Sequence, residues 1–236
     1  LRTGEEPIAP DPDLGAAADF LRMMTGETPG ETAVAALDKS LLLYLEHGLN
    51  ASTFACRVVA STLADMHAAL TAGVAALSGP LHGGANEQAM RMLEEIGDVD
   101  AVDAYLNEQL AAGRKVMGFG HRVYRTEDPR ATHLREMARR LGEDAGDSSW
   151  YELSRAVERG MQERKGLYCN VDFYCATVYR HLGIPLDLFT PLFALGRTGG
   201  WTAHVMEQHR DNRLIRPRAD YVGEIDRPYV LIENRD

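Results

Sequence analysis

The hydrophobic residues of this chain recur with the period of an α-helix. The plainest example is one helical face formed by Ala85, Ala89, Met92, Leu93 and Ile96. The alternation typical of a β-strand is nearly absent, and residues 229–232 are the main candidate for a strand. The pattern predicts an all-α fold with helices over residues 14–25, 31–46, 51–77, 85–96, 101–112, 130–142, 149–164, 174–182 and 200–211.

The composition makes several classes of protein improbable. The chain has 236 residues and a net charge of −10, which opposes binding to nucleic acid or to an anionic membrane. No apolar run approaches the ~20 residues that span a bilayer. The chain has three cysteines, Cys56, Cys169 and Cys175, and none of them forms a Cys-x-x-Cys motif with another. We therefore expect neither a disulfide framework nor a cysteine zinc site. A reducing, cytoplasmic location fits best.

The chemistry is expected in the breaks between helices. His82 lies in a glycine-containing turn, residues 78–84, at the N-terminal end of the helix over 85–96. Unpaired N–H groups there disfavour an imidazolium, so His82 should be neutral and able to donate a hydrogen bond to a carbonyl oxygen that becomes an enolate. The alternative is a histidine that merely belongs to a capping turn, and the spacing leaves both open.

A second break covers residues 115–130. The glycine pair within 118–120 is not a dinucleotide-binding motif, because the third glycine is missing and no βαβ pattern surrounds it. His121 lies beside Arg122, Arg125 and Arg130, a combination that can polarise a carbonyl and hold a carboxylate. A solvated face of arginines is the alternative, and for Arg122 alone it is favoured.

A third break contains Asp172 among apolar residues. A poorly solvated carboxylate binds protons more tightly and is a better base toward a carbon acid. The competing interpretation is a helix cap, because either Asn170 or Asp172 precedes a helical run. The local sequence favours the cap.

Two further segments concentrate histidine or arginine. His47 lies in residues 46–52, which interrupt two helices, and residues 210–218 form a basic cluster in an acidic chain. Such a cluster fits a small polyanion, with a surface interaction patch as the alternative. His204 and His209 are five residues apart and not the four that stack on a helix face, so we expect no metal site.

In this order, these segments closely resemble citrate synthase, in particular its compact archaeal and bacterial type. The resemblance runs from about Ala35 to Tyr221, and residues 118–130 match the family signature without a gap. The remaining matching segments are Leu45-Glu46-His47-Gly48, Asn50-Ala51-Ser52, Gly79-Pro80-Leu81-His82-Gly83, Asn170-Val171-Asp172, Gly196-Arg197 and Ile215-Arg216-Pro217.

The resemblance implies an all-α, two-domain, citrate synthase-like helical fold that forms a homodimer with a shared active site. The implied reaction is the tricarboxylic acid cycle step that condenses acetyl-CoA with oxaloacetate and water to citrate and CoA, with no cofactor, as the small domain closes over the large one. The implied division is a large-domain part over residues 1–84, a small domain over 85–182, and a large-domain part with a C-terminal arm over 183–236.

Family members carry a further N-terminal helical section of the large domain to which nothing here corresponds. The chain also opens at Leu1, with neither an initiating methionine nor a secretion signal. We therefore expect a fragment or a processed product.

The resemblance also implies roles for individual residues. Asp172 would remove a methyl proton from acetyl-CoA, His82 would stabilise the enol, and His121 would polarise the ketone of oxaloacetate. The residues that hold oxaloacetate would be His47, His121, Arg130 and Arg197, together with Arg216, which serves the partner subunit's site. The CoA-binding residues would be Gly118, Phe119, Gly120 and Arg125, with Arg164 and Lys165 added from charge and position.

Two alternatives to this function stay open. One is 2-methylcitrate synthase acting on propionyl-CoA, because one extra methylene shifts selectivity by only ~1–3 kcal/mol and leaves the catalytic motifs intact. The other is a non-catalytic helical dimerisation fragment. The motifs do not separate these from a citrate synthase.

Overall fold

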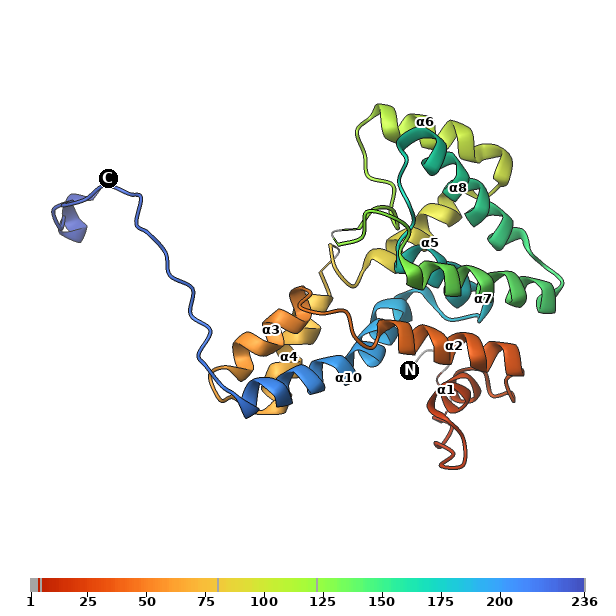
Figure 1. Ribbon diagram of the computed structural model, residues 1–236, viewed down its shortest axis with the longest axis horizontal. Coiled ribbons are helices and arrows are strands. Elements are labelled where there is room, and N and C mark those ends of the chain that lie inside the picture. Colours follow the sequence, from red (N-terminus) through yellow and green to blue (C-terminus); the bar gives the residue numbers. More distant parts are fainter. Residues whose placement is uncertain (1–3, 5, 80, 122, 236) are drawn as a thin grey trace.

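The computed structural model describes residues 4, 6–79, 81–121 and 123–235, and the regular structure there is helical (Figure 1). Each predicted helix has a counterpart. The α-helices are α1 Ala16–Thr25, α2 Glu31–Tyr44, α3 Ala51–Ala60, α4 Met66–Leu77, α5 Ala85–Ile96, α6 Val102–Ala111, α7 Pro129–Ala145, α8 Ser149–Lys165, α9 Val171–His181 and α10 Phe189–Arg210. The short 3₁₀ helices are η1 Val99–Ala101, η2 Leu186–Leu188 and η3 Ile232–Asn234. In the described part, no helix is long and apolar enough to cross a bilayer.

The strand predicted over residues 229–232 is wrong. This segment is irregular up to η3, and Tyr229 and Ile232 are 80% and 78% exposed. No neighbouring strand runs beside it among the described residues, so neither ladder hydrogen bonds nor apolar burial can stabilise a strand there.

The single helix predicted over residues 51–77 is in fact two helices, α3 and α4, joined by a turn. Leu63 in the turn has a φ of +64°, a left-handed conformation that a helix cannot continue through. Asp65 then caps α4, because its carboxylate accepts a hydrogen bond from the N–H of Ala68 at 2.8 Å. The two helices pack against each other, so both have a buried hydrophobic face. The hydrophobic pattern therefore continues past the turn, and the sequence alone did not reveal the break.

The long helix α10 begins at Phe189 and not near residue 200 as predicted. The first half of this helix was not predicted because it contains glycines, which are unfavourable inside helices. They are needed because α2 passes very close. A Cβ on Gly196 would lie 2.9 Å from the carbonyl oxygen of Leu41, and one on Gly200 would lie 2.1 Å from that of Leu45. This close packing places the C-terminal end of α2 against α10.

Helix α9 lies at the centre of the core. It packs against α2, α5, α7 and α8, and every residue from Phe173 to Tyr179 is buried. Helix α10 packs against α2, α3 and α4 (Figure 1). Helix α2 therefore contacts the helices around α9 as well as α10. Residues from these two groups of helices lie close together near its C-terminal end.

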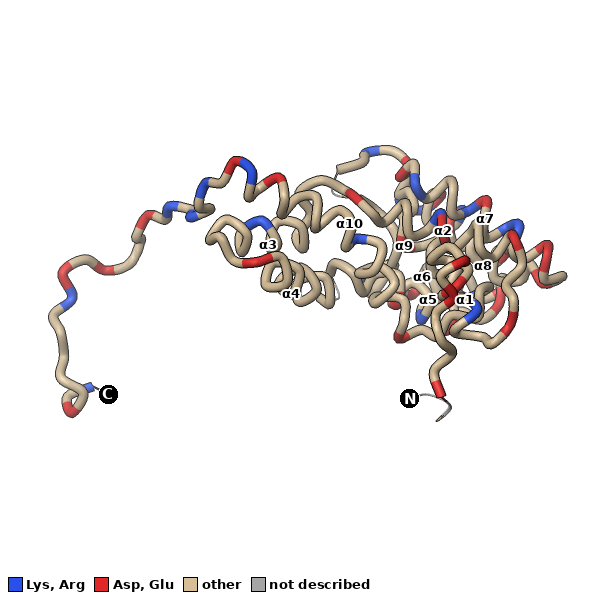
Figure 2. The backbone as a smooth tube through the Cα atoms, turned by 90° about the horizontal axis from the view of Figure 1, so that it is seen from below, with Lys and Arg blue, Asp and Glu red and all other residues tan. Residues whose placement is uncertain are grey.

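After α10 the chain leaves the helical body as an arm. Residues 211–235 extend away from the helices in both views (Figures 1 and 2), and the colouring of Figure 2 marks both basic and acidic residues along them. Ser61 anchors the start of the arm, because its hydroxyl accepts from the N–H of Ile215 at 3.0 Å and its carbonyl accepts from Asn212 at 3.0 Å. Apart from Ile215, the described arm residues are exposed.

Candidate active site

A cavity of about 920 Å³ is lined by residues from the ends of α3, α5, α7 and α9 and from α10. Its wall also includes the loop after α2, the turn before α5 and the loop before α7. The structure thus brings together seven residues named from the sequence, which are His47, His82, Gly120, His121, Arg130, Asp172 and Arg197. These seven come from segments far apart in the chain.

His121 is held in one tautomer. Its Nδ1 accepts hydrogen bonds from the backbone N–H groups of Val123 at 3.0 Å and Tyr124 at 3.1 Å. The ring proton therefore lies on Nε2, which is 3.2 Å from Nε2 of His47. Burial lowers the pKa of His121, and the charge of Arg130 lowers it further, although Asp128 opposes both effects. A neutral ring with a fixed Nε2–H can polarise a carbonyl oxygen.

His47 completes this pair of rings. Burial lowers its pKa to about 4, and the charges of Arg130 and His121 act in the same direction. His47 is therefore neutral at physiological pH and acts as a hydrogen-bonding group.

His82 is also neutral, as predicted, but mainly for a different reason. Burial is the main cause of its lowered pKa, and the charge of Arg197 adds to it. Helix α5 starts only at Ala85, and its N-cap is Gly84, so His82 is not a capping side chain. The N–H of Ser52 donates to Nε2 of His82 at 3.3 Å, and the Ser52 hydroxyl lies 2.8 Å from the same nitrogen. Nε2 therefore acts as an acceptor, which leaves the ring proton on Nδ1.

Asp172 is not the cap that the local sequence favoured. The cap of α9 is Asn170, whose side-chain oxygen accepts from the N–H of Asp172 at 3.0 Å. The Asp172 carboxylate is left to face the cavity. Burial raises its pKa to about 6, against the hydrogen bond from Tyr44 and the charge of Arg130, which lower it. A carboxylate with this proton affinity is suited to act as a general base.

Arg130 is fixed by a carboxylate that sequence reasoning missed. Asp128 caps α7 and has a fully buried side chain, and its two oxygens accept from Nε of Arg130 at 3.0 Å and from Nη2 at 2.8 Å. Asp128 also accepts from the N–H of Val171 at 3.2 Å, which ties α7 to the start of α9. The signal was present, because Asp followed by Pro is a typical N-cap and N1 pair.

Arg197 is a buried cation with unused hydrogen-bonding capacity. It is 2% exposed, and its Nε donates to the carbonyl oxygen of Tyr44. Its Nη1 is buried and has no hydrogen-bond partner in the described structure. Burial and the charge of Arg130 lower the pKa of Arg197 to about 10, so it remains charged. An unpaired buried N–H beside a second cation favours an anion in the cavity.

A second cavity of about 450 Å³ adjoins the first, since Leu81, Ala85 and Asn170 line both. Of the predicted CoA-binding residues, Gly118, Phe119 and Lys165 line it. Sequence reasoning missed Arg114, which also lines it, and did not single out its neighbour Lys115. Their signal was two adjacent cations just before the glycine turn.

The structure places the other named residues elsewhere. Arg164 donates to Asp103 at 2.6 Å and to Asn107 at 3.0 Å on α6, and Arg125 is exposed and lines neither cavity. Arg216 is exposed on the arm, and Arg122 lies outside the described residues.

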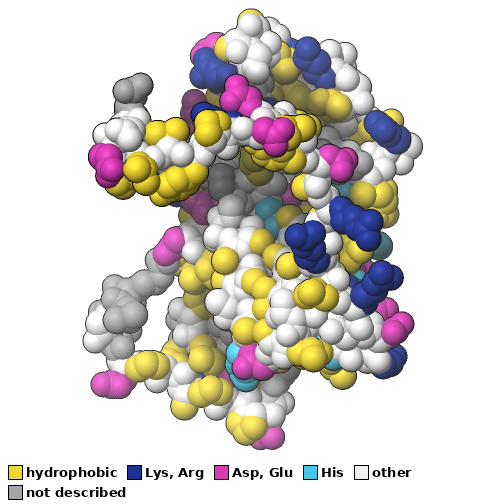
Figure 3. All heavy atoms as spheres, turned by 90° about the vertical axis from the view of Figure 1, so that its left-hand side faces the viewer, with side chains coloured by type: hydrophobic (Ala, Val, Ile, Leu, Met, Phe, Trp, Pro, Cys, Tyr) yellow, Lys and Arg dark blue, Asp and Glu magenta, His cyan; other side chains and the backbone are white. Residues whose placement is uncertain are grey.

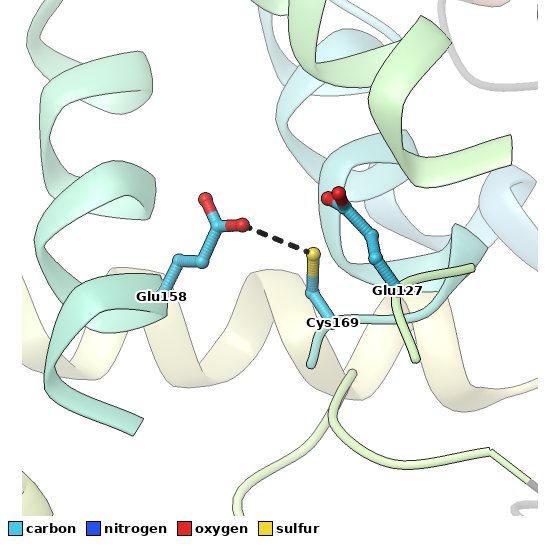
Figure 4. Close-up of side chains that lie close together, drawn as sticks. All are labelled: Glu127, Glu158 and Cys169. Carbon is cyan, nitrogen blue, oxygen red and sulfur yellow. Dashed lines mark hydrogen bonds between the residues drawn. The ribbon is translucent and has the colours of Figure 1, made fainter. Parts of the chain in front are cut away.

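A different cluster groups three possible metal ligands, which are Glu127, Glu158 and Cys169 (Figure 4). Its chemistry does not fit a metal ion. The guanidinium of Arg135 donates to both glutamates, and Arg155 donates to Glu158, so two cations balance the two carboxylates. Burial raises the pKa of the Cys169 thiol to about 12, so it is protonated and donates to Glu158 at 3.5 Å. The cluster joins α7 to α8 and to the loop before α9.

Together, the helical fold and the groups that line the large cavity indicate a helical protein with an acid–base site for an anionic compound. Its site combines a carboxylate with a raised pKa, three neutral imidazoles and two guanidinium groups, of which that of Arg197 is buried and that of Arg130 half-buried. These groups suit acid–base chemistry on an anionic carbonyl compound.

The comparisons with known proteins agree with this class. The chain belongs to the citrate synthase family, because the family model described as the citrate synthase C-terminal domain matches residues 1–218. Citrate synthase 2 of Bacillus subtilis is 51% identical over 235 residues, which cover 100% of this chain and 63% of that protein. The 2-methylcitrate synthase of Shewanella oneidensis is 48% identical over 219 residues, which cover 92% of this chain and 58% of that protein. The chain thus spans less than two thirds of these relatives.

Solved structures show the same fold. The citrate synthase of Thermoplasma acidophilum, in a ternary complex with carboxymethyl coenzyme A and oxaloacetate, is 40% identical with a TM-score of 0.89, and the match covers 99% of this chain and 63% of that one. Citryl-CoA lyase from Hydrogenobacter thermophilus is 30% identical with a TM-score of 0.78, and the match covers 92% of this chain and 88% of that one.

Proposed function

We propose that this chain carries the catalytic residues of a citrate synthase, which condenses acetyl-CoA with oxaloacetate and water to give citrate and CoA. The observation that supports this most is Asp172, a carboxylate with a pKa of about 6 in the same cavity as His82 and Arg197. A condensation of this kind needs a base for a carbon acid, a hydrogen-bond donor for the enol oxygen and a cationic site for the oxo acid.

The residues divide the reaction among them. Asp172 takes a proton from the methyl group of acetyl-CoA, and the electron pair moves to the thioester oxygen, where the Nδ1–H of His82 stabilises it. The enolate carbon then attacks the ketone carbon of oxaloacetate, and the ketone oxygen, which accepts a hydrogen bond from the Nε2–H of His121, takes up a proton to become the hydroxyl group of citryl-CoA. Water hydrolyses the resulting thioester and releases CoA.

Oxaloacetate would be held by the cations of the larger cavity. Arg130 is already oriented by Asp128, and the unpaired Nη1 of Arg197 offers a donor for a carboxylate. His47 is neutral and hydrogen-bonds without adding charge. CoA would lie in the adjoining cavity, with its phosphates near Lys115 and Lys165 and its reactive end toward the first cavity.

We also propose a homodimer in which Arg216 completes the partner subunit's site. Two observations support it: Arg216 is exposed on the arm and lines neither cavity of its own chain, and the surface of α3, α4 and α10 carries exposed apolar side chains. Figure 3, which views that side, shows hydrophobic side chains across its surface. Examples are Phe54 at 46%, Val74 at 50%, Leu195 at 55% and Met206 at 59% exposed. Exposed apolar surface of this kind favours association.

We further propose a cytoplasmic enzyme without a resident cofactor. The three cysteines are buried and unpaired, which is usual in a reducing compartment. Proton removal, enolate stabilisation and polarisation of the ketone are each assigned above to a side chain of the protein.

Two related activities have specific support. A 2-methylcitrate synthase is a relative at 48% identity, and such an enzyme would use propionyl-CoA in place of acetyl-CoA. Citryl-CoA lyase is a structural neighbour, and the match covers 88% of its chain. A lyase would break the same carbon–carbon bond without hydrolysing the thioester.

One set of assays on the full-length protein separates these functions. We expect CoA release, measured with a thiol reagent, to depend on both oxaloacetate and acetyl-CoA, with a higher kcat/KM for acetyl-CoA than for propionyl-CoA. The reverse preference would identify a 2-methylcitrate synthase. Cleavage of citryl-CoA to acetyl-CoA and oxaloacetate without citrate formation would identify a lyase. A folded, dimeric protein with none of these activities would be the non-catalytic helical fragment.

A further inference from the structure

Tyr44 links the candidate base to the candidate anion site. It is the last residue of α2 and is fully buried, with its ring centroid 4.0 Å from that of Phe193. Its hydroxyl donates to Oδ1 of Asp172 at 3.0 Å, and its carbonyl oxygen accepts from Nε of Arg197. One buried residue therefore touches the proton acceptor and one of the cations, although it does not line the cavity itself.

The hydrogen bond fixes the orientation of the Asp172 carboxylate. In the described structure, Tyr44 is the only side chain that donates a hydrogen bond to it, and it occupies Oδ1. Oδ2 is thereby left for the cavity. Because the donor is a phenol, the bond also favours the ionised carboxylate over the protonated one.

The other titratable or charged groups around Asp172 come from several elements. Arg130 and Asp128 face it from the start of α7, and Arg197 faces it from α10. Cys175 and Tyr179 lie on α9 itself, and burial raises the pKa of both, so they are neutral at physiological pH. None of these groups donates a hydrogen bond to the carboxylate in the described structure.

We propose that Tyr44 is a positioning residue for Asp172: its hydroxyl sets the rotation of the carboxylate, keeps it ionised and presents the second oxygen to the carbon acid. This inference rests on the proposed role of Asp172 as the base. Tyr44 does not touch the substrate, and acts only through Asp172.

The test compares Tyr44→Phe with a matched control, Tyr179→Phe, in the full-length protein. Both variants remove one hydroxyl from a fully buried tyrosine near Asp172, but the hydroxyl of Tyr179 accepts from Ser40 at 3.3 Å and makes no hydrogen bond to Asp172 in the described structure. The protonation of Asp172 is followed by its carboxylic-acid infrared band, which is identified by its loss in Asp172→Asn. The pH profile of kcat is measured in parallel.

We expect Tyr44→Phe to raise the titration midpoint of Asp172 by about one pH unit, since one hydrogen bond to a charged group is lost. The acid limb of the kcat profile should move by the same amount, so kcat falls about tenfold below both midpoints and recovers toward wild type at high pH. Tyr179→Phe should leave both midpoints unchanged. Replacing Tyr44 by a fluorinated tyrosine, a stronger donor with nearly the same shape, should shift the midpoint down even if Tyr44→Phe folds poorly.

An unchanged infrared midpoint in Tyr44→Phe, or an equal shift in Tyr179→Phe, would overturn the proposal. A loss of kcat that is uniform over pH would do so too, because it would mean that Tyr44 only fills the core. If the wild type shows none of the proposed activities while the infrared midpoint still shifts, the link between Tyr44 and Asp172 stands and the proposed reaction fails.

Discussion

Replacing Asp172 by asparagine should make the protein less active and more stable. The ordinary pKa of an aspartate is 3.8, and burial raises that of Asp172 to about 6. The folded state therefore binds this proton more tightly than the unfolded state does. Its stabilising contribution is complete below about pH 4 and is lost as the pH rises through about 6. A difference of roughly two pH units corresponds to about 3 kcal/mol.

Asparagine keeps the shape and can still accept the hydrogen bond from Tyr44, but it carries no charge at any pH. Asp172→Asn should therefore be more stable than wild type by up to about 3 kcal/mol above pH 7, with little difference near pH 4. Its kcat should fall ~10²–10⁴-fold, because the proton acceptor is gone. Binding of oxaloacetate should persist, since the arginines are unchanged.

The assays are urea unfolding followed by circular dichroism at the two pH values, and steady-state kinetics with a thiol reagent. The wild-type kcat should itself fall about tenfold between pH 7 and pH 5, as the ionised fraction drops from about nine tenths to about one tenth. A variant that is equally stable at both pH values, or that turns over at a near-normal rate, would refute the assignment of a buried base.

Three further experiments test other parts of the structure. Lys165→Ala should raise the KM for acetyl-CoA roughly tenfold, whereas Arg164→Ala, whose side chain is occupied on α6, should change it little. Gly200→Ala should lower the free energy of unfolding by ~1–3 kcal/mol and raise the KM for oxaloacetate, because the added methyl group forces α10 away from the end of α2. An unchanged free energy of unfolding would contradict this close packing. The variants Arg216→Ala and Asp172→Asn should each be inactive. Mixing the two proteins should restore up to roughly a quarter of wild-type activity, because each heterodimer contains one intact site. No recovery despite verified subunit exchange would place Arg216 in its own subunit's site.

The sequence identified residues that share one cavity, but it did not identify the hydrogen bonds that connect them. His82, His121 and Asp172 were named from short segments, and the structure brings all three to one cavity. The choice of helix cap was beyond local sequence, because Asn170 and Asp172 both carry a side-chain oxygen that can accept from a backbone N–H. Only the fold shows that Asn170 makes that bond and that Asp172 faces the cavity instead.

Long-range contacts account for most of what sequence reasoning missed. Tyr44 meets Asp172 across a separation of 128 residues, and no local pattern records such a contact. The same limit applies to α10, whose glycines look like helix breakers until α2 is seen to pass within contact of Gly196. Periodicity reports which face of a helix is buried, but not which distant segment covers it.

The net charge of the chain and the charge of its cavity also have to be reconciled. A chain with net charge −10 repels a dianion at long range, yet the cavity contains Arg130 and Arg197. Charges on the surface are screened over about 8 Å at physiological ionic strength, whereas buried charges are screened much less. Affinity for an anion therefore depends on contacts made inside the cavity, where the buried Nη1 of Arg197 has no hydrogen-bond partner among the described residues and can donate to a carboxylate. The acidic surface then acts against nonspecific polyanions without weakening the site itself.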